Sequence, residues 1–229
     1  MSCNCDLHGP YRCIDIVPIF HHLSGDEVSE IASITHQRNY KKGESLYRMG
    51  QKRGELFVLH KGLVKISRLT YDGKEQIVRL VRSGEFLGEI NLFSHSEQTD
   101  NAVALEETEV CLIEWKALRQ LMEKIPSIAF KVMEQLSLRL EETQKRVEQT
   151  TFHSVEHRLA AYLLQLSEGK EFITLELSKG DLASLLGTTL ETLSRRLSAF
   201  AQQDIISLKG QRGIKILNRH ALTEYTEQQ

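Results

Sequence analysis

Residues Ser178–Phe200 have the sequence SKGDLASLLGTTLETLSRRLSAF, which predicts two short helices joined by a tight turn. Ser178 can cap the first helix, with Asp181 as the answering acid three residues later. Gly187 is expected to end the first helix, because a residue without a β-carbon tolerates positive φ. Thr188 is expected to cap the second helix. Apolar residues at helical spacing predict the buried sides, namely Leu182, Leu185 and Leu186, then Leu190, Leu193, Leu197 and Phe200.

The second helix leaves polar and basic side chains on its outer face, near its N-terminal half. In a helix-turn-helix, this part of the second helix meets base edges in the major groove. Arg195 can donate a bidentate pair to guanine, Glu191 can accept from a cytosine amino group, and Ser194 can bond either way. The predicted DNA contacts are Thr189, Glu191, Thr192, Ser194, Arg195 and Arg196. The alternative is a capped, solvated helix pair, as in proteins that never touch DNA.

A basic hairpin is predicted directly after these helices. Residues 204–217, DIISLKGQRGIKIL, indicate two strands around a turn that holds Lys209 and Arg212. Although the chain has a net charge of −2, basic residues gather between Arg195 and Lys215. A hairpin with basic tips after a helix-turn-helix is a wing, and it is expected to contact phosphates without carrying much sequence information.

Length and composition limit the number of domains and the class of protein. The 229 residues are enough for one large or two modest domains, and 41% hydrophobic with 26% charged residues is an ordinary globular composition. No apolar run approaches the ~20 residues that span a bilayer. The start, MSCNCDLHGPYRC, lacks the basic and apolar regions of a secretory signal. We therefore expect a cytoplasmic protein with no membrane partner.

The first half of the chain changes from a helical to a strand pattern. Ser24 and Glu27 predict a capped helix, and from about residue 40 to 115 glycines separate short apolar or alternating runs. Asp72-Gly73 between two such runs is a strong hairpin signal. Many short strands at this spacing indicate a β barrel or roll.

Helical spacing returns after Trp115. One helix is predicted to end near Pro126 and a long one to begin around Ser127. Its apolar stripe is favoured as a contact with the same helix of a second chain, over packing on the chain's own β domain. The stripe consists of Ile128, Val132, Leu136, Leu140 and Val147, with Ala129 and Met133 between, and Arg139 is placed on the opposite, charged face.

Together, the glycine-punctuated roll, long helix and winged helix-turn-helix resemble the Crp/Fnr family of bacterial transcription regulators over about residues 15–220. The most specific pieces are GEFLGEINLF (Gly84–Phe93) and ETLSR (Glu191–Arg195). The resemblance implies an α+β protein that binds double-stranded DNA as a homodimer, with RNA polymerase as a further partner. The implied segments are a cysteine-containing arm (1–20), a β-roll sensor domain resembling a cyclic-nucleotide-binding jelly roll (21–125), a dimerisation helix (126–150) and a winged helix-turn-helix domain (151–229).

The Glu-x-x-Ser-Arg pattern resembles the FNR branch of that family. The resemblance implies that Glu191, Ser194 and Arg195 recognise a TTGA-type half-site within a palindrome. Leu190 stands where the CRP branch carries a base-contacting arginine, which again indicates the FNR branch.

A cyclic nucleotide is not the expected effector. In cyclic-nucleotide binders of the family a Gly-Glu pair holds the ribose, and an Arg-Ser pair about ten residues later holds the phosphate. Gly88-Glu89 matches the first pair, but the second falls near Thr99-Asp100-Asn101 and has no arginine. An aspartate there would repel the phosphate. Gly88 and Glu89 are then expected to serve only the turn.

Three of the four cysteines, Cys3, Cys5 and Cys13, lie in the arm, and Cys111 lies in the roll. In a cytosolic protein such a cluster suggests metal or redox chemistry. The layout resembles FNR-type sensors, which implies a [4Fe-4S] cluster on these four thiolates and a redox or oxygen response. The spacing C-x-C-x7-C departs from the family's C-x2-C-x5-C, so His8 is a candidate substitute ligand. The alternatives are a Cys13–Cys111 disulfide switch, zinc on Cys3, Cys5, Cys13 and His8, or a buried Cys111 that merely packs.

No enzymatic activity is expected. The chain has no Walker loop, H-E-x-x-H or nucleophile elbow. The roll region holds only His60 and His95, too few for the metal site of a cupin enzyme. An effector-binding regulatory subunit without DNA contact would keep the roll but lack the wing, so Lys209 and Arg212 disfavour it.

Overall fold

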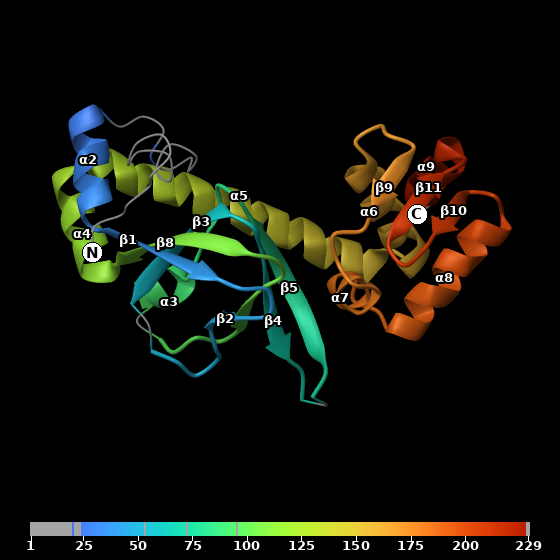
Figure 1. Cartoon of the computed structure of the whole chain (residues 1–229), viewed down its shortest axis with the longest axis horizontal. Helices are drawn as coiled ribbons and strands as arrows, with labels where there is room; N and C mark the ends of the chain where they lie inside the picture. Colours follow the sequence, from blue (N-terminus) through green and yellow to red (C-terminus); the bar gives the residue numbers. More distant parts are fainter. Residues whose placement is uncertain (1–19, 21–23, 53, 72, 95, 228–229) are drawn as a thin grey trace. The chain divides into compact units, whose positions relative to one another are not determined.

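The computed structural model describes residues 20, 24–52, 54–71, 73–94 and 96–227. The chain divides into two compact units, Met1–Leu140 and Glu141–Gln229, and the division falls within the long helix α5 (Pro126–Phe152). The first unit is mainly β and the second mainly α (Figure 1). The predicted α+β class is confirmed.

The first unit begins with helix α2 (Gly25–Ser33), whose predicted cap is confirmed. The backbone N–H of Ser24 donates to Glu27 Oε2 over 2.7 Å, and the N–H of Glu27 donates to Ser24 Oγ over 3.5 Å. This reciprocal pair satisfies two N–H groups that the helix itself cannot bond.

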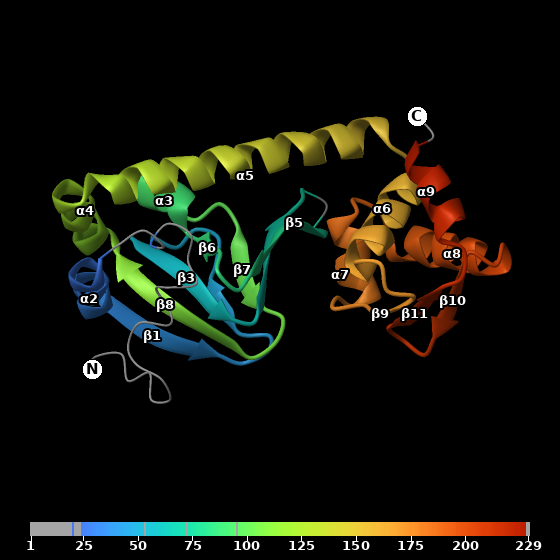
Figure 2. The same cartoon turned by 90° about the horizontal axis from the view of Figure 1, so that it is seen from above.

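Two antiparallel four-stranded sheets form the predicted roll (Figure 2). A hairpin joins β4 to β5, as Asp72-Gly73 predicted, with Gly73 at a φ of 77°. One sheet has the order β1 (Thr35–Tyr40), β8 (Thr108–Glu114), β3 (Glu55–Lys61) and β6 (Phe86–Leu87), and the other β2 (Ser45–Tyr47), β7 (Asn101–Ala104), β4 (Leu63–Leu69) and β5 (Glu75–Arg82).

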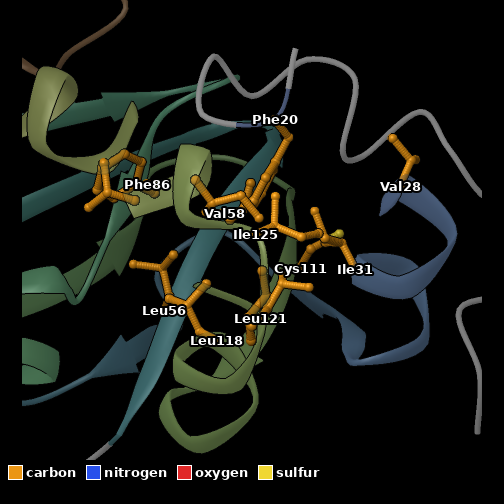
Figure 3. Close-up of a cluster of buried hydrophobic side chains, with 13 residues drawn as sticks. Phe20, Val28, Ile31, Leu56, Val58, Phe86, Cys111, Leu118, Leu121 and Ile125 are labelled. Carbon is orange, nitrogen blue, oxygen red and sulfur yellow. The ribbon is translucent and has the colours of Figure 1, made fainter. Parts of the chain in front are cut away.

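Strands β3 and β8 of the first of these sheets are buried on both faces. Along β3, Phe57 and Leu59 face the core between the two sheets, whereas Leu56 and Val58 belong to a second core on the outer side. This alternation follows from the two-residue period of a strand. Helices α2, α4 (Trp115–Lys124) and the start of α5 contribute to the outer core (Figure 3), and α3 (Glu89–Ser94) completes the unit.

Only the later part of the predicted apolar stripe of α5 is exposed, and the first part is buried against the roll. The prediction that the whole stripe contacts a second chain is therefore wrong. Ile128 and Val132 are buried in the outer core of the roll, and Leu136 packs against it. Leu140 and Val147 are exposed, at 60% and 59%. The prediction failed because the outer face of the β1–β8–β3–β6 sheet is apolar and needs covering. The helix also begins at Pro126, one residue before the predicted start.

The second unit is a winged helix-turn-helix, as predicted. Helices α7 and α8 are followed by the β10–β11 hairpin, and β9 completes an antiparallel sheet of order β10–β11–β9. Its core includes Leu159, Leu163, Leu182, Leu193 and Phe200, all buried. The elements are α6 (Val155–Ser167), β9 (Phe172–Thr174), α7 (Lys179–Leu185), α8 (Leu190–Gln202), β10 (Ile206–Lys209), β11 (Gly213–Ile216) and α9 (Arg219–Glu227).

The turn between α7 and α8 is mostly as predicted. Ser178 Oγ accepts the N–H of Asp181 over 3.0 Å, and Gly187 has a φ of 65°. The cap of α8 is Thr189 rather than Thr188, since Thr189 Oγ1 accepts the N–H of Thr192 over 3.2 Å. Leu190 is 52% exposed instead of buried, because it begins the helix beyond the turns that pack on the core.

In the part of the chain that the structure describes, no helix combines the length and apolar character needed to cross a bilayer.

Candidate functional site

The outer face of α8 presents two charged side chains one turn apart. Glu191 and Arg195 are 80% and 70% exposed, and Arg195 Nη2 lies 3.4 Å from Glu191 Oε1. An exposed pair of this kind contributes only about 0–1 kcal/mol, so it can open to bond elsewhere. Ser194 is half-buried beside them. A carboxylate, a hydroxyl and a guanidinium on one helix segment form a hydrogen-bonding surface suited to base edges.

Two further predicted contacts, Thr189 and Thr192, build the start of α8. Thr189 Oγ1 caps the helix and lies 3.0 Å from Thr192 Oγ1. Both hydroxyls are therefore engaged at the N-terminus, where the free N–H groups of the first turn and the helix dipole favour an anion such as a phosphate.

Arg196, also predicted to contact DNA, bonds within the protein. Its Nη1 lies 2.8 Å from Glu156 Oε1 on α6, and the two side chains are 45% and 23% exposed. The structure therefore brings Glu191, Ser194 and Arg195 together on α8 and directs Arg196 toward α6.

The wing presents Lys209 and Arg212, both exposed, at the turn between β10 and β11. Arg212 Nη1 donates to the carbonyl of Glu176 over 3.4 Å. Gly213 is sterically required, because a β-carbon there would lie 2.5 Å from the carbonyl oxygen of Lys209. The turn thus holds two cations at the end of a constrained hairpin, which suits phosphate contact.

Glu89 does not serve a plain turn, so that prediction is wrong. Its side chain is 5% exposed and forms an ion pair with Nη1 of Arg139, which α5 contributes. Arg139 and Arg79 each donate to the carbonyl of Phe86 over 3.1 Å, and Arg139 lies over the Phe86 ring. The buried pair links α5 to the interior of the roll, so Arg139 does not lie on a solvent face. Gly88 is also required sterically, since a β-carbon would lie 2.7 Å from the carbonyl oxygen of Glu55.

A buried carboxylate occupies the region of the roll where the family resemblance would place a phosphate. Burial raises the pKa of Asp100, while its hydrogen bond with Tyr47 and the charge of Arg68 act in the opposite direction. Burial, and then the charge of Asp100, also raise the pKa of Tyr47. Asp100 Oδ1 and both side-chain polar atoms of buried Gln98 have no hydrogen-bond partner among the described residues.

Two family models match the chain. One, for a cyclic nucleotide-binding domain, matches residues 37–125, and the other, for a Crp-like helix-turn-helix domain, matches residues 157–225. The fumarate and nitrate reduction regulatory protein of Yersinia pestis is 30% identical over 211 residues, which cover 88% of this chain and 83% of that protein. The chain belongs to the Crp/Fnr family of transcription regulators.

Other similar proteins agree with this membership. A probable transcriptional regulator flp from Lacticaseibacillus casei is 29% identical over 217 residues, covering 94% of this chain and 98% of that protein. The structure of FixK2 from Bradyrhizobium japonicum has a TM-score of 0.72 at 25% identity, with 84% of this chain and 97% of that chain covered. This Crp/Fnr chain is therefore a DNA-binding transcription regulator and not an enzyme.

Cys111 of this Crp/Fnr regulator lies on β8, buried in the outer core of the roll. Its neighbours in that cluster include Phe20, Ile31 and Leu121 (Figure 3). Cys3, Cys5, Cys13 and His8 lie outside the described residues. Within those described residues, no three His, Cys, Asp or Glu side chains are grouped to hold a metal ion.

Sequence reasoning missed two features of this Crp/Fnr regulator. The Glu89–Arg139 pair was missed because its partners are fifty residues apart and on different elements. The ion pair of Arg196 with Glu156 was missed for the same reason, since its partners are forty positions apart. One signal for the first pair was available in the sequence. Arg139 lies one helical turn from Leu136 of the apolar stripe, so its charge could lie at the buried side of the helix.

Proposed function

We propose that this protein is a redox- or oxygen-responsive regulator that recognises a palindromic TTGA-type DNA site as a homodimer. The observation that carries the proposal is the exposed Glu191–Arg195 pair on the N-terminal half of α8, with Ser194 beside it. In a helix-turn-helix this segment contacts base edges. As a DNA-binding regulator it would act in the cytoplasm, with RNA polymerase as its partner.

The exposed side of α5 supports a homodimer. Met133, Leu140 and Val147 are 51%, 60% and 59% exposed and follow one another at intervals of seven residues. Apolar residues repeated at this interval occupy one of the two heptad positions that form the seam of a coiled coil. A second copy of α5 would cover them and place two α8 helices in successive major grooves, about 34–36 Å apart.

The interior of the roll disfavours a cyclic nucleotide as effector. Such a ligand needs an available cation at its phosphate, and where it would lie Arg68 Nη2 is already 3.9 Å from Oδ2 of the buried Asp100. Glu89, where the ribose would bind, is already paired with Arg139. Both carboxylates oppose an anionic ligand.

The cysteines fit an iron–sulfur cluster in number and reach. Phe20, seven residues after Cys13, packs in the same cluster as Cys111. Seven residues span at most about 25 Å, which limits how far Cys13 can lie from Phe20 and so from the core cluster that holds Cys111. Cys3, Cys5, Cys13 and Cys111 would hold a [4Fe-4S] cluster, which when bound supplies a centre sensitive to oxygen and to reduction. A Cys13–Cys111 disulfide is the second candidate, supported by the same reach.

Purification of the full chain without oxygen tests the cluster. We expect a brown protein with about four iron and four sulfide per chain, because four thiolates are the usual ligands of a [4Fe-4S] cluster. Replacing Cys111 by Ser should lower both contents and bleach the colour, as measured by metal analysis and absorbance. A colourless protein that contains zinc, or an oxidised Cys13–Cys111 pair in peptide mass spectra, would reject the cluster.

The wing is tested by replacing Lys209 with Ala. We expect weaker binding to every DNA sequence and a flatter dependence of log K on log salt, by about 0.9 for one lost phosphate contact. Lys116→Ala, an exposed lysine on α4, is the matched control and should change neither quantity. A change in base preference at constant salt dependence would show that the wing does not act on phosphates.

The function as a whole is tested by titrating the oxygen-free full chain against an inverted repeat of TTGA half-sites. We expect tight binding of two chains per duplex, which is lost when one half-site is scrambled. Equal affinity for scrambled duplexes, or one chain per duplex, would contradict the proposal.

A further inference from the structure

Arg158, near the start of α6, connects two helix ends. Its Nη1 donates to the carbonyl of Thr150, in the last turn of α5, over 3.4 Å, and to that of His153, the residue after α5, over 2.6 Å. Its Nε donates to the carbonyl of Leu186, the residue that ends α7, over 2.9 Å. One guanidinium thus bonds the long helix and the turn of the helix-turn-helix at once.

The chemistry of helix ends explains why an arginine suits this place. The last carbonyls of a helix have no partner within it, and the negative end of the helix dipole favours a cation. An arginine presents its donors in a rigid planar fork, so it can bond carbonyls from two directions.

Two other contacts lie at the same junction. A β-carbon at Gly187 would lie 3.8 Å from Thr150 Cγ2, so the turn lies against the end of α5. The rings of His153 and His157 stack with centroids 3.8 Å apart and planes at 7°. The compact second unit accordingly begins at Glu141, within α5, and not at the break between α5 and α6.

We propose that Arg158 fastens the last turns of α5 to the turn of the helix-turn-helix, so that α8 moves as one body with the end of the dimer helix. Arg158 is then a positioning residue that sets the separation of the two α8 helices in the dimer. A change in how two α5 helices pair would then change the position of α8, because residues 150–158 would not bend to absorb it. This inference rests on the proposed dimeric DNA recognition.

The test compares Arg158→Met with a matched control, Arg219→Met. Arg219 lies in the same unit and donates to Ser167 Oγ over 3.0 Å, so it bonds α6 and not the end of α5. Affinities are measured for inverted repeats whose half-sites are moved apart or together by single base pairs. Should Arg158→Met fail to fold, Arg158→Lys takes its place, because it keeps the charge without the fork.

We expect wild type and Arg219→Met to prefer one spacing sharply. In Arg158→Met the ratio of the affinities for the preferred and the shifted spacings should fall about tenfold, the factor for one charge-assisted hydrogen bond. The base preference within each half-site should not change. Amide hydrogen exchange at residues 150–154 and 187–189 should also rise about tenfold over that of Arg219→Met. Equal spacing preference and equal exchange in the two variants would overturn the inference. If wild type ignores inverted repeats, the proposed function fails, and the exchange rates still decide whether Arg158 fastens the junction.

Discussion

Replacing Arg139 by Met is expected to lower the free energy of unfolding of the first unit by up to about 3–5 kcal/mol, because the buried Glu89 carboxylate loses its nearer guanidinium and keeps only Arg79 Nη1, 3.9 Å away. The side chain of Glu89 is 5% exposed, so water cannot replace the lost guanidinium. Urea denaturation followed by tryptophan fluorescence measures this effect, since Trp115 is the sole tryptophan and belongs to the first unit.

Two variants make this test specific. Arg119→Met breaks an exposed pair with Glu123 and should change stability by less than about 1 kcal/mol. Glu89→Gln combined with Arg79→Met and Arg139→Met removes all three charges of this cluster and should restore part of the loss, since none of these buried charges is then left alone. A loss from Arg139→Met no larger than that from Arg119→Met would mean that the pair does not stabilise the roll.

Replacing Arg195 by Ala is expected to weaken specific DNA binding by about 1–3 kcal/mol and to relax discrimination at one base pair of each half-site. The loss should arise in binding and not in folding, because the exposed Glu191–Arg195 pair contributes little to stability. Titrations against half-sites with every base at each position measure the change.

Arg196→Ala is the comparison variant for this second prediction. Its guanidinium bonds Glu156 on α6, so its loss should leave the base preference unchanged. If Arg195→Ala keeps full discrimination at every position, or if Arg196→Ala relaxes it instead, the assignment of Arg195 to base recognition is wrong.

The two helices of the helix-turn-helix were predictable because the signals for them act over short distances in the sequence. Ser178, Asp181 and Gly187 act within a few residues of themselves, so their spacing predicts the first helix and its end. Thr188 and Thr189 can both cap a helix, and only the packing of α8 decides between them. The exposure of Leu190 likewise depends on where the core ends, which helical spacing cannot reveal.

The first unit was less predictable because its important contacts are between residues far apart in the sequence. The stripe of α5 has the same spacing whether it covers the roll or a second chain. A better signal lay in the strands, since four apolar residues in a row at 56–59 and at 110–113 indicate strands buried on both faces. Such strands require a helix on the outer side, and Ile128 and Val132 provide it.

The bonds of Arg158 also decide where the chain can be cut. A fragment that begins at Val155 would lack the carbonyls of Thr150 and His153, and its arginine would keep only the Leu186 bond. A fragment that begins at Glu141 retains all three acceptors and the whole second unit. The isolated DNA-binding half should therefore be expressed with the final turns of the long helix attached, although the matched helix-turn-helix domain starts only at residue 157.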